Sequence, residues 1–390
     1  MALDPRWAEE FQRRFDEERH KIGRFNILVC GKTGSGKSTL INAIFGADVA
    51  PTGNGVPVTL GTEYFAHPRL PVGVFDTQGF ETGEAGDRIL DRLDAEITSR
   101  RAGPVSEQVH AVWYLVRSGD RRFEDSQAGF VRRLAEMGVP VLTVLSQVPV
   151  RDGHIHPDAV ELAAAIESRG LPTRPTPAPI LTNARVDPWV TPELHGLHQL
   201  LDATAEVIPA SVRAALEAAQ RIDLQRKRRR ARLAIRTATT AAAGTCAVPL
   251  PIADAAALFP IQMGMLAAIS AAYGVPTPSS RLVQAFGSIM VATGASTVGR
   301  YLAGTIVKFV PGAGAVTGYV IKASVASSVT LAMGYAWMAV NERLVGMTEE
   351  EASAFLSSDA VKTAFVDAFK SAWAERKRLG KEIEDQAPGD

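Results

Sequence analysis

The sequence predicts two structural classes within one chain of 390 residues, an α/β domain in the first half and an all-α domain in the second. The α/β prediction rests first on a glycine-rich loop at residues 31–38, which stands between an apolar strand-like segment and an apolar helical one. A second strand-like segment ends in Asp-x-x-Gly at residues 76–79 and supports the same class. The all-α prediction rests on residues 237–345, which are rich in Ala, Gly and Leu and carry few charges.

The composition indicates which kinds of partner and which cellular compartment to expect. Lys and Arg number 42, as do Asp and Glu, so the formal net charge is zero and no overall field attracts nucleic acid. We therefore expect no nucleic-acid partner. The two cysteines, Cys30 and Cys246, lie in apolar segments, which indicates a reducing compartment without a disulfide framework. The amino terminus is charged and has no apolar signal region, so we expect a cytoplasmic location.

The glycine-rich loop reads GKTGSGKS and fits the phosphate-binding pattern G-x-x-x-x-G-K-[ST]. In such a loop the backbone N–H groups point at phosphate oxygens, and the following helix adds the partial positive charge of its first turn. We expect Lys37 to reach the β- and γ-phosphates and the Ser38 hydroxyl to ligate Mg²⁺. The predicted phosphate contacts are Lys32, Thr33, Gly34, Ser35, Gly36, Lys37, Ser38 and Thr39.

The Asp-x-x-Gly element follows the short apolar strand 72–75. Asp76 is predicted to hold the shell of the Mg²⁺ ion, and the Gly79 N–H to bond the γ-phosphate without obstruction by a side chain. Alone this motif is weak. Its position after the phosphate-binding loop makes it a strong indication of a nucleoside triphosphate site.

Residues 24–208 resemble a GTPase domain of the Era-like, septin-related branch of the translation-factor class. Besides the two motifs, the resemblance rests on the segments 109–116, 117–123, 124–137, 139–145 and 180–184. It implies a six-stranded, mostly parallel sheet with helices on both faces, GTP and Mg²⁺ as ligands, and hydrolysis of GTP. It also implies that the loop containing Asn183 and Ala184 touches the base.

The same resemblance assigns a role to the Gly- and Pro-rich segment 48–61, which we expect to be a mobile loop. Its Thr59 would close over the nucleotide with its hydroxyl on Mg²⁺ and its N–H on the γ-phosphate, although Thr52 and Thr62 are alternatives. The predicted catalytic set is Lys37, Thr59 and Gly79, and the predicted metal ligands are Ser38, Thr59 and Asp76.

Two departures from the family pattern bear on specificity and rate. Ser146-Gln147-Val148-Pro149 stands where the family reads guanine with Asn or Thr, Lys, any residue and Asp, so guanine specificity is inferred from the fold; Asp152 is a possible substitute. Phe80 follows the Asp-x-x-Gly motif and cannot orient water, so we expect slow hydrolysis unless a charge is supplied. Arg121 and Arg122 are candidates for that charge, although a solvated arginine pair is the more ordinary interpretation.

The second half begins with a basic connector, residues 209–236, whose dense run at 221–232 fits a solvated helix, an anionic-lipid contact or an RNA contact. The apolar domain 237–345 follows, with two uncharged windows of near-spanning length at 255–274 and 323–340. Its Ala-rich composition and its prolines argue for a packed bundle instead, and Asp254 argues against burial in lipid. This part resembles an uncharacterised apolar domain of some bacterial GTPases, similar in layout to the immunity-related GTPases of animals, which act on membranes.

The remaining segments are expected to be helical or disordered. Residues 1–23 predict a helix with Trp7, Phe11 and Phe15 on one face, docked on the nucleotide domain. Residues 346–380 predict two helices beginning with a capping box at Thr348 and Glu351, and residues 381–390 predict a disordered tail.

Together these observations predict a GTP-binding protein that hydrolyses GTP slowly with Mg²⁺ and couples its switch loops to an apolar helical domain. That domain would associate with a second copy or with the inner face of the membrane, either peripherally or by insertion. The alternatives are a nucleotide-binding structural or oligomerising module without meaningful hydrolysis, and an RNA- or ribosome-associated GTPase.

Overall fold

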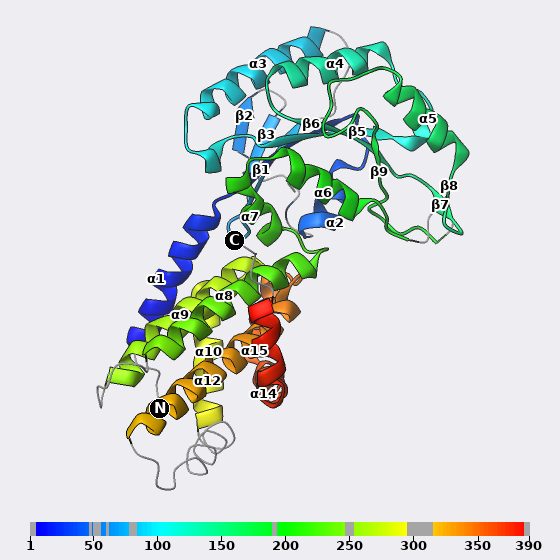
Figure 1. The fold of residues 1–390 in the computed structure, drawn as a ribbon. Coiled ribbons are helices and arrows are strands. Elements are labelled where there is room, and N and C mark those ends of the chain that lie inside the picture. Colours follow the sequence, from blue (N-terminus) through cyan, green and yellow to red (C-terminus); the bar gives the residue numbers. More distant parts are fainter. Residues whose placement is uncertain are drawn as a thin grey trace. The chain divides into compact units, whose positions relative to one another are not determined.

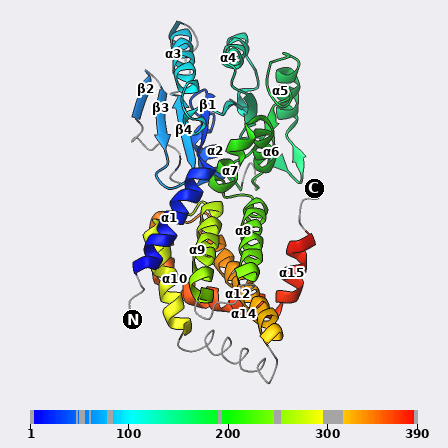
Figure 2. The same ribbon diagram turned by 60° about the vertical axis from the view of Figure 1, so that its left-hand side comes forward.

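The computed structural model describes residues 5–46, 49, 56–59, 62–77, 84–188, 193–245, 253–294 and 315–385. The chain forms two compact units, drawn in Figures 1 and 2. The sheet unit runs from Ile22 to Asp223, and the helical unit combines Met1–Lys21 with Leu224–Asp390. The sheet unit is therefore inserted into the sequence of the helical unit, between its first helix and the rest.

The sheet unit contains a mostly parallel seven-stranded sheet in the order β2-β3-β4-β1-β5-β6-β9. The four pairings from β4 to β9 are parallel, and the two pairings that join β2, β3 and β4 are antiparallel. This confirms the predicted fold class, with one strand more than expected because residues 56–66 form the β2–β3 pair at the sheet edge. The strands are β1 (Phe25–Gly31), β2 (Val56–Thr59), β3 (Thr62–Ala66), β4 (Val72–Thr77), β5 (Ala111–Arg117), β6 (Val141–Ser146) and β9 (Ile180–Leu181).

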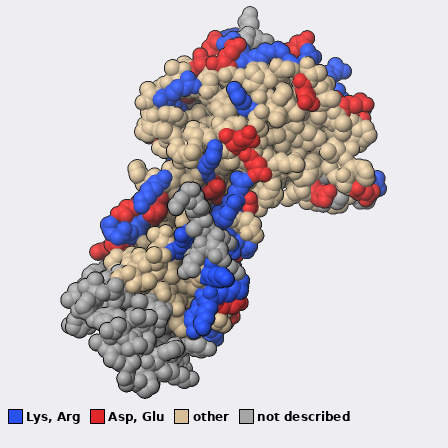
Figure 3. Space-filling view, viewed as in Figure 1, with Lys and Arg blue, Asp and Glu red and all other residues tan. Residues whose placement is uncertain are grey.

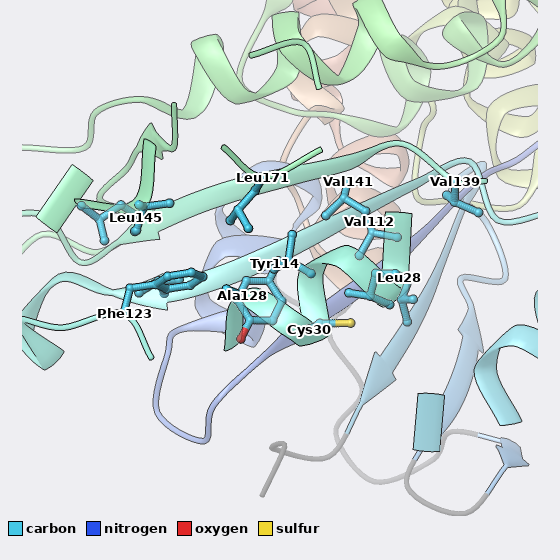
Figure 4. Close-up of a cluster of buried hydrophobic side chains, with 14 of the residues drawn as sticks. Leu28, Cys30, Val112, Tyr114, Phe123, Ala128, Val139, Val141, Leu145 and Leu171 are labelled. Carbon is cyan, nitrogen blue, oxygen red and sulfur yellow. The ribbon is translucent and has the colours of Figure 1, made fainter. Parts of the chain in front are cut away.

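Helices cover both faces of this sheet, as the fully buried sequence FNILVCG of β1 requires. The side chains of Leu28, Cys30 and Tyr114 point to one face and join a large core with three helices (Figure 4). Those helices are α3 (Glu84–Arg101), α4 (Asp125–Glu136) and α5 (Pro157–Glu167).

The opposite face of the sheet is covered by α2 (Lys37–Phe45), α6 (Leu197–Val207) and α7 (Ala210–Ala219) (Figure 1). Phe45 of α2 packs on Phe25 of β1 and stacks on Trp113 of β5, with ring centroids 6.3 and 6.1 Å apart. Trp113 also donates from Nε1 to Thr204 Oγ1 of α6 at 3.0 Å. The element that follows the glycine-rich loop is thus anchored in the core of the unit.

The helical unit places α1 among the carboxyl-terminal helices. Phe11 and Phe15 are buried, and Ser279 donates a hydrogen bond to Gln12. The expectation that α1 docks on the nucleotide domain is therefore wrong, because its aromatic face belongs to the other unit. The described helices of this unit are α1 (Pro5–Ile22), α8 (Leu224–Thr245), α9 (Ala253–Tyr273), α10 (Ser279–Gly294), α12 (Ala315–Leu344), α13 (Glu349–Ser357), α14 (Asp359–Ala374) and α15 (Arg376–Asp385).

Two boundaries differ from those expected from the sequence. The sheet unit ends at Asp223 and not at 208, because α7 buries Val212, Ala215 and Leu216 and contacts β1 and β4. The last helix continues through Lys381 to Asp385, so the first half of the expected disordered tail is helical. The capping box of Thr348 and Glu351 is present at the start of α13.

The two apolar windows lie in α9 and α12, which pack against each other and against α8. Trp337 of α12 is fully buried, and its Nε1 donates to Ser270 Oγ at 2.9 Å and to the Leu266 carbonyl at 3.2 Å on α9. None of the described helices combines the length and the hydropathy that crossing a bilayer requires.

Part of the basic run serves the interior of the helical unit. Lys227 is 1% exposed and donates to the Tyr273 carbonyl at the end of α9 at 2.8 Å. Arg228 forms a bidentate pair with Glu342 of α12 at 2.7 and 2.9 Å, and the Tyr273 hydroxyl donates to the same carboxylate at 2.9 Å. Although burial raises it, the hydrogen bonds from Arg228 and Tyr273 hold the pKa of Glu342 below its usual value. These cations are not available to a lipid or RNA surface.

A buried polar network ties β1 to the strand beside it at the end remote from the glycine-rich loop. The Asn26 N–H donates to His110 Nδ1 at 2.9 Å, and His110 Nε2 contacts the Val105 carbonyl at 2.7 Å. The Asn26 side chain donates to the carbonyls of Ser106 and Gln108, both at 2.9 Å. The imidazole is thereby held in the neutral form, because a protonated Nδ1 could not accept from Asn26.

This network predicts a pH-dependent stability of the sheet unit. Burial lowers the pKa of His110, so the unfolded chain binds more protons than the folded one below about pH 6.5. The contribution of neutral His110 to the free energy of unfolding is complete above that pH. It is lost as the pH falls toward the pKa of the folded state, and its size is on the order of 1 kcal/mol. Urea unfolding at pH 7, 6 and 5 should show this loss in the wild type.

The variant His110→Gln should be less stable at pH 7 but should show a shallower fall toward pH 5. His198→Gln is the matched control, because it removes an exposed imidazole on α6 that makes none of these contacts. An equal pH dependence in wild type and His110→Gln would contradict the assignment.

Candidate nucleotide-binding site

The glycine-rich loop connects the carboxyl end of β1 to the start of α2, at the sheet edge where ligands bind in parallel α/β folds. Three of its glycines have positive φ angles, 144° at Gly31, 79° at Gly34 and 87° at Gly36. A Cβ on Gly31 would lie 2.5 Å from the Leu115 carbonyl oxygen of β5, so only glycine fits there.

The first turn of α2 presents its backbone N–H groups at the loop. Gly36 is the N-cap and has no side chain to cap the first turn, so the N–H groups there can face an anion. Ser38 and Thr39 are exposed there, and Lys37 folds back over the loop to donate from Nζ to the Gly31 carbonyl at 3.0 Å. A phosphate at the helix start would offer this ammonium a charged acceptor in place of a carbonyl.

Other residues of the loop divide into exposed and anchored ones. Thr33 and Gly34 are exposed at the tip, whereas Ser35 is 2% exposed and donates its N–H to the Lys32 carbonyl at 3.1 Å. The Lys32 side chain is turned aside to Glu124 at the N-cap of α4, with 3.3 Å between Nζ and Oε2. In this conformation Lys32 can therefore contact a phosphate through its backbone and not through its ammonium group.

The residues predicted to hold Mg²⁺ converge in part. Asp76 is the penultimate residue of β4 and pairs in the parallel register with Val29, two residues before the loop. Ser38 is exposed in the first turn of α2. A carboxylate and a hydroxyl beside a phosphate fit Mg²⁺, which binds proteins through few carboxylates and keeps phosphate and water ligands. The described residues contain no cluster of three or more His, Cys, Asp or Glu that could hold a metal ion.

The third predicted metal ligand and the rest of the catalytic set are only partly described. Thr59 ends β2 and pairs through its backbone with Thr62, and nothing is described of its side chain. Gly79 and Phe80 lie outside the described residues. Lys37 is thus the one member of the predicted catalytic set whose side chain the structure places.

Two residues that the sequence indicated only as departures from the family pattern bind the glycine-rich loop directly. Ser146 Oγ donates to the Ser35 carbonyl at 2.6 Å, and Gln147 Nε2 donates to the Gly34 carbonyl at 2.8 Å. Gln147 has a φ of 54°, and its own carbonyl accepts from Ser118 Oγ at 2.8 Å. Their position at the carboxyl end of β6, where Ser146 is the last strand residue and Gln147 follows it, is the available signal, since that strand ends at the same edge as β1.

The loop expected to touch the base is braced internally. Asn183 is buried, and its Nδ2 donates to the carbonyls of Arg185 and Glu193 at 2.6 and 3.0 Å. Its backbone pairs with His195, and the half-buried Ala184 follows it. Asn183 therefore shapes this loop with its side chain and leaves backbone groups, including that of Ala184, as the contacts available to a base.

The remaining candidates lie in surface turns. Asp152 and Gly153 form the two-residue turn of a hairpin between β7 (Val150–Arg151) and β8 (His154–Ile155), with positive φ at both residues. Arg121 is 74% exposed and pairs with Asp158 of α5 at 2.9 Å, and Arg122 is also exposed. In this conformation the Arg121 guanidinium is held by α5.

Comparisons with known proteins agree with this geometry. Residues 26–147 match the family model described as 50S ribosome-binding GTPase, and residues 211–364 match a domain of unknown function. Cell division control protein 10 of Saccharomyces cerevisiae is 29% identical over 147 residues, which are 30% of this chain and 46% of that protein. The match thus spans less than half of that relative.

Solved structures match parts of the chain at low identity and low TM-score. A probable GTP-binding protein engB matches with a TM-score of 0.32 and 15% identity over 47% of this chain and 97% of that one. Aquifex aeolicus Era bound to GDP and AlF₄⁻ matches with a TM-score of 0.32 and 12% identity over 56% and 67% of the two chains. On the two family matches, the chain carries a P-loop GTPase domain, and the helical region that follows it matches a domain of unknown function.

Proposed function

We propose that this protein is a GTPase switch that binds GTP with Mg²⁺, hydrolyses it slowly and couples the nucleotide state to the helical unit. The observation that carries the proposal is the loop around Gly31, Gly34 and Gly36, with Lys37 and the uncapped start of α2 directed at one anion position. Ser38 and Asp76 would hold Mg²⁺, which supplies charge neutralisation for the phosphates when bound. The local similarity to cell division control protein 10, a septin, supports placing the domain in the Era-like, septin-related branch.

The substitution Lys37→Ala should lower the affinity for a nucleoside triphosphate by about 100-fold, because it removes a charge-assisted contact to two phosphates. Fluorescent-nucleotide titration measures the affinity, and a thermal melt checks that the variant is folded. Arg213→Ala is the matched control, since Arg213 is an exposed cation on α7 of the same unit. A Lys37→Ala protein that binds as tightly as the control would contradict the site.

The alternative is a nucleotide-binding structural or self-associating module without meaningful hydrolysis. Phosphate release from GTP by the wild type, measured at several protein concentrations, distinguishes the two. Release abolished by Lys37→Ala supports the enzyme, and a rate per molecule that rises with concentration supports a second copy that supplies a catalytic charge. Binding without any release supports the structural module.

Base discrimination should be weak, because Gln147 binds the glycine-rich loop and Pro149 has no carboxylate to read the guanine N–H groups. We expect ATP to compete with GTP within a factor well below the roughly 10⁴-fold that a hydrogen-bonding pocket achieves. Pro149→Asp should raise the preference for GTP, and Arg151→Asp places the same carboxylate on the neighbouring hairpin as a control. A wild type that already prefers GTP by about 10⁴-fold would show that another group reads the base.

We further propose that the protein is cytoplasmic and that α8 contacts an anionic membrane surface peripherally. Beyond the internal pairs of Lys227 and Arg228, Arg229 is exposed, and Leu233 one turn further is 59% exposed. Figure 3 shows Lys and Arg side chains on the viewed face of the helical unit, interspersed with Asp and Glu. A cation near an anionic surface contributes about 1 kcal/mol, and an adjacent leucine adds apolar contact.

Co-sedimentation with phosphatidylserine-containing vesicles tests this contact. The double variant Arg229→Glu and Leu233→Ser should reduce vesicle binding by about tenfold or more, and wild-type binding should weaken as salt is raised. Arg213→Glu in the sheet unit is the charge-matched control. Equal recovery in the soluble fraction with anionic and neutral vesicles would contradict the proposal, and salt-sensitive RNA binding by the same face would favour the RNA alternative.

A further inference from the structure

The carboxyl end of α2, the helix that begins at the glycine-rich loop, is capped by a residue far away in the sequence. The last carbonyls of a helix have no partners within it. At the end of α2 the Gly46 N–H donates to the Asn42 carbonyl at 3.1 Å, and Arg221 supplies the next two donors. Its backbone N–H donates to the Ile44 carbonyl at 2.8 Å, and its Nε donates to the Ala43 carbonyl at 3.1 Å. The guanidinium also complements the negative end of the helix dipole.

Arg221 stands in the segment through which the chain leaves the sheet unit. Residues 220–223 separate the end of α7 from the start of α8. Gln220 is 1% exposed and holds this segment as a turn, since its Oε1 accepts from the Asp223 N–H at 2.6 Å and its Nε2 donates to the Asp223 carbonyl at 2.8 Å. The exit segment is thus a compact turn fastened to α2 by Arg221.

The chain enters the sheet unit at the other flank of the same loop. The helix α1 ends at Ile22, and after Gly23 and Arg24 the strand β1 begins at Phe25. The chain therefore enters the sheet unit through β1, the strand that precedes the glycine-rich loop. It leaves through the segment 220–223, which is hydrogen-bonded to α2, the helix that follows the loop. Both covalent connections to the helical unit are thus attached to β1–loop–α2.

We propose that Arg221 is a positioning residue that links the occupancy of the phosphate site to the order of the exit segment 220–223. The inference rests on the proposed nucleotide site and adds its regulation. Anion binding at the first turn of α2 stabilises the helix, and a stable last turn keeps both Arg221 acceptors in place. By reciprocity, a fastened exit segment raises nucleotide affinity by the same factor as nucleotide orders the segment.

Hydrogen exchange in the full chain, with and without a non-hydrolysable GTP analogue, tests this link. In the wild type the analogue should slow exchange of a peptide covering residues 219–225 by about fivefold, within the usual range of coupling between sites. Arg221→Ala should lose most of this protection and bind the analogue about fivefold more weakly. Arg221→Lys should recover part of both, because an ammonium still reaches the helix carbonyls, and Arg213→Ala should behave as wild type.

Each outcome decides the inference. Nucleotide binding without added protection of 219–225 in the wild type overturns it and leaves the proposed function intact. Equal protection and affinity in Arg221→Ala and wild type also overturn it. A wild type that binds no nucleotide removes both proposals. If Arg221→Ala does not fold, the wild-type exchange and the Arg221→Lys variant still decide, because a purely structural arginine would leave exchange in 219–225 independent of nucleotide.

Discussion

The nucleotide site depends on the missing side chain at Gly31. The loop passes so close to the Leu115 carbonyl that a Cβ would lie 2.5 Å from it, and this approach sets the path of the next residues. The loop then needs donors for its outward carbonyls. Lys37, the Ser35 N–H, Gln147 and Ser146 supply them at Gly31, Lys32, Gly34 and Ser35 respectively. With these carbonyls engaged, the N–H groups of the loop and of α2 are left facing the anion position.

The parts of this site that could be predicted are those encoded within a short stretch of sequence. The spacing of three glycines, Lys37 and Ser38 determines a loop geometry almost by itself, and the strand before it must be buried in a parallel sheet. Gln147 could not be assigned in this way. Its role depends on β6 pairing with β5, which in turn pairs with β1, so that β6 and β1 end at the same edge. This is a property of the assembled sheet.

The helical unit shows the limit of pattern-based inference more clearly. The basic run predicts a charged surface, yet Lys227 is buried and donates to the last turn of α9. The apolar windows predict segments that resemble membrane spans, yet Trp337 is hydrogen-bonded inside the bundle. Periodicity reports which face of a helix is buried and does not report against what. The same ambiguity applies to α1, because the spacing of Phe11 and Phe15 predicts a buried face but not that this face lies in the helical unit.

The insertion of the sheet unit between α1 and α8 has a consequence for how the chain folds. Contacts between α1 and the rest of its unit join residues separated by roughly 200 positions, and closing so long a loop has an entropic cost that grows with its length. A folded sheet unit shortens the loop, because α7 packs on β1 and brings the point of exit near the point of entry. We therefore expect the inserted sheet unit to fold first during synthesis. Its folding would lower the entropic cost of packing α1 against the helices that are synthesised later.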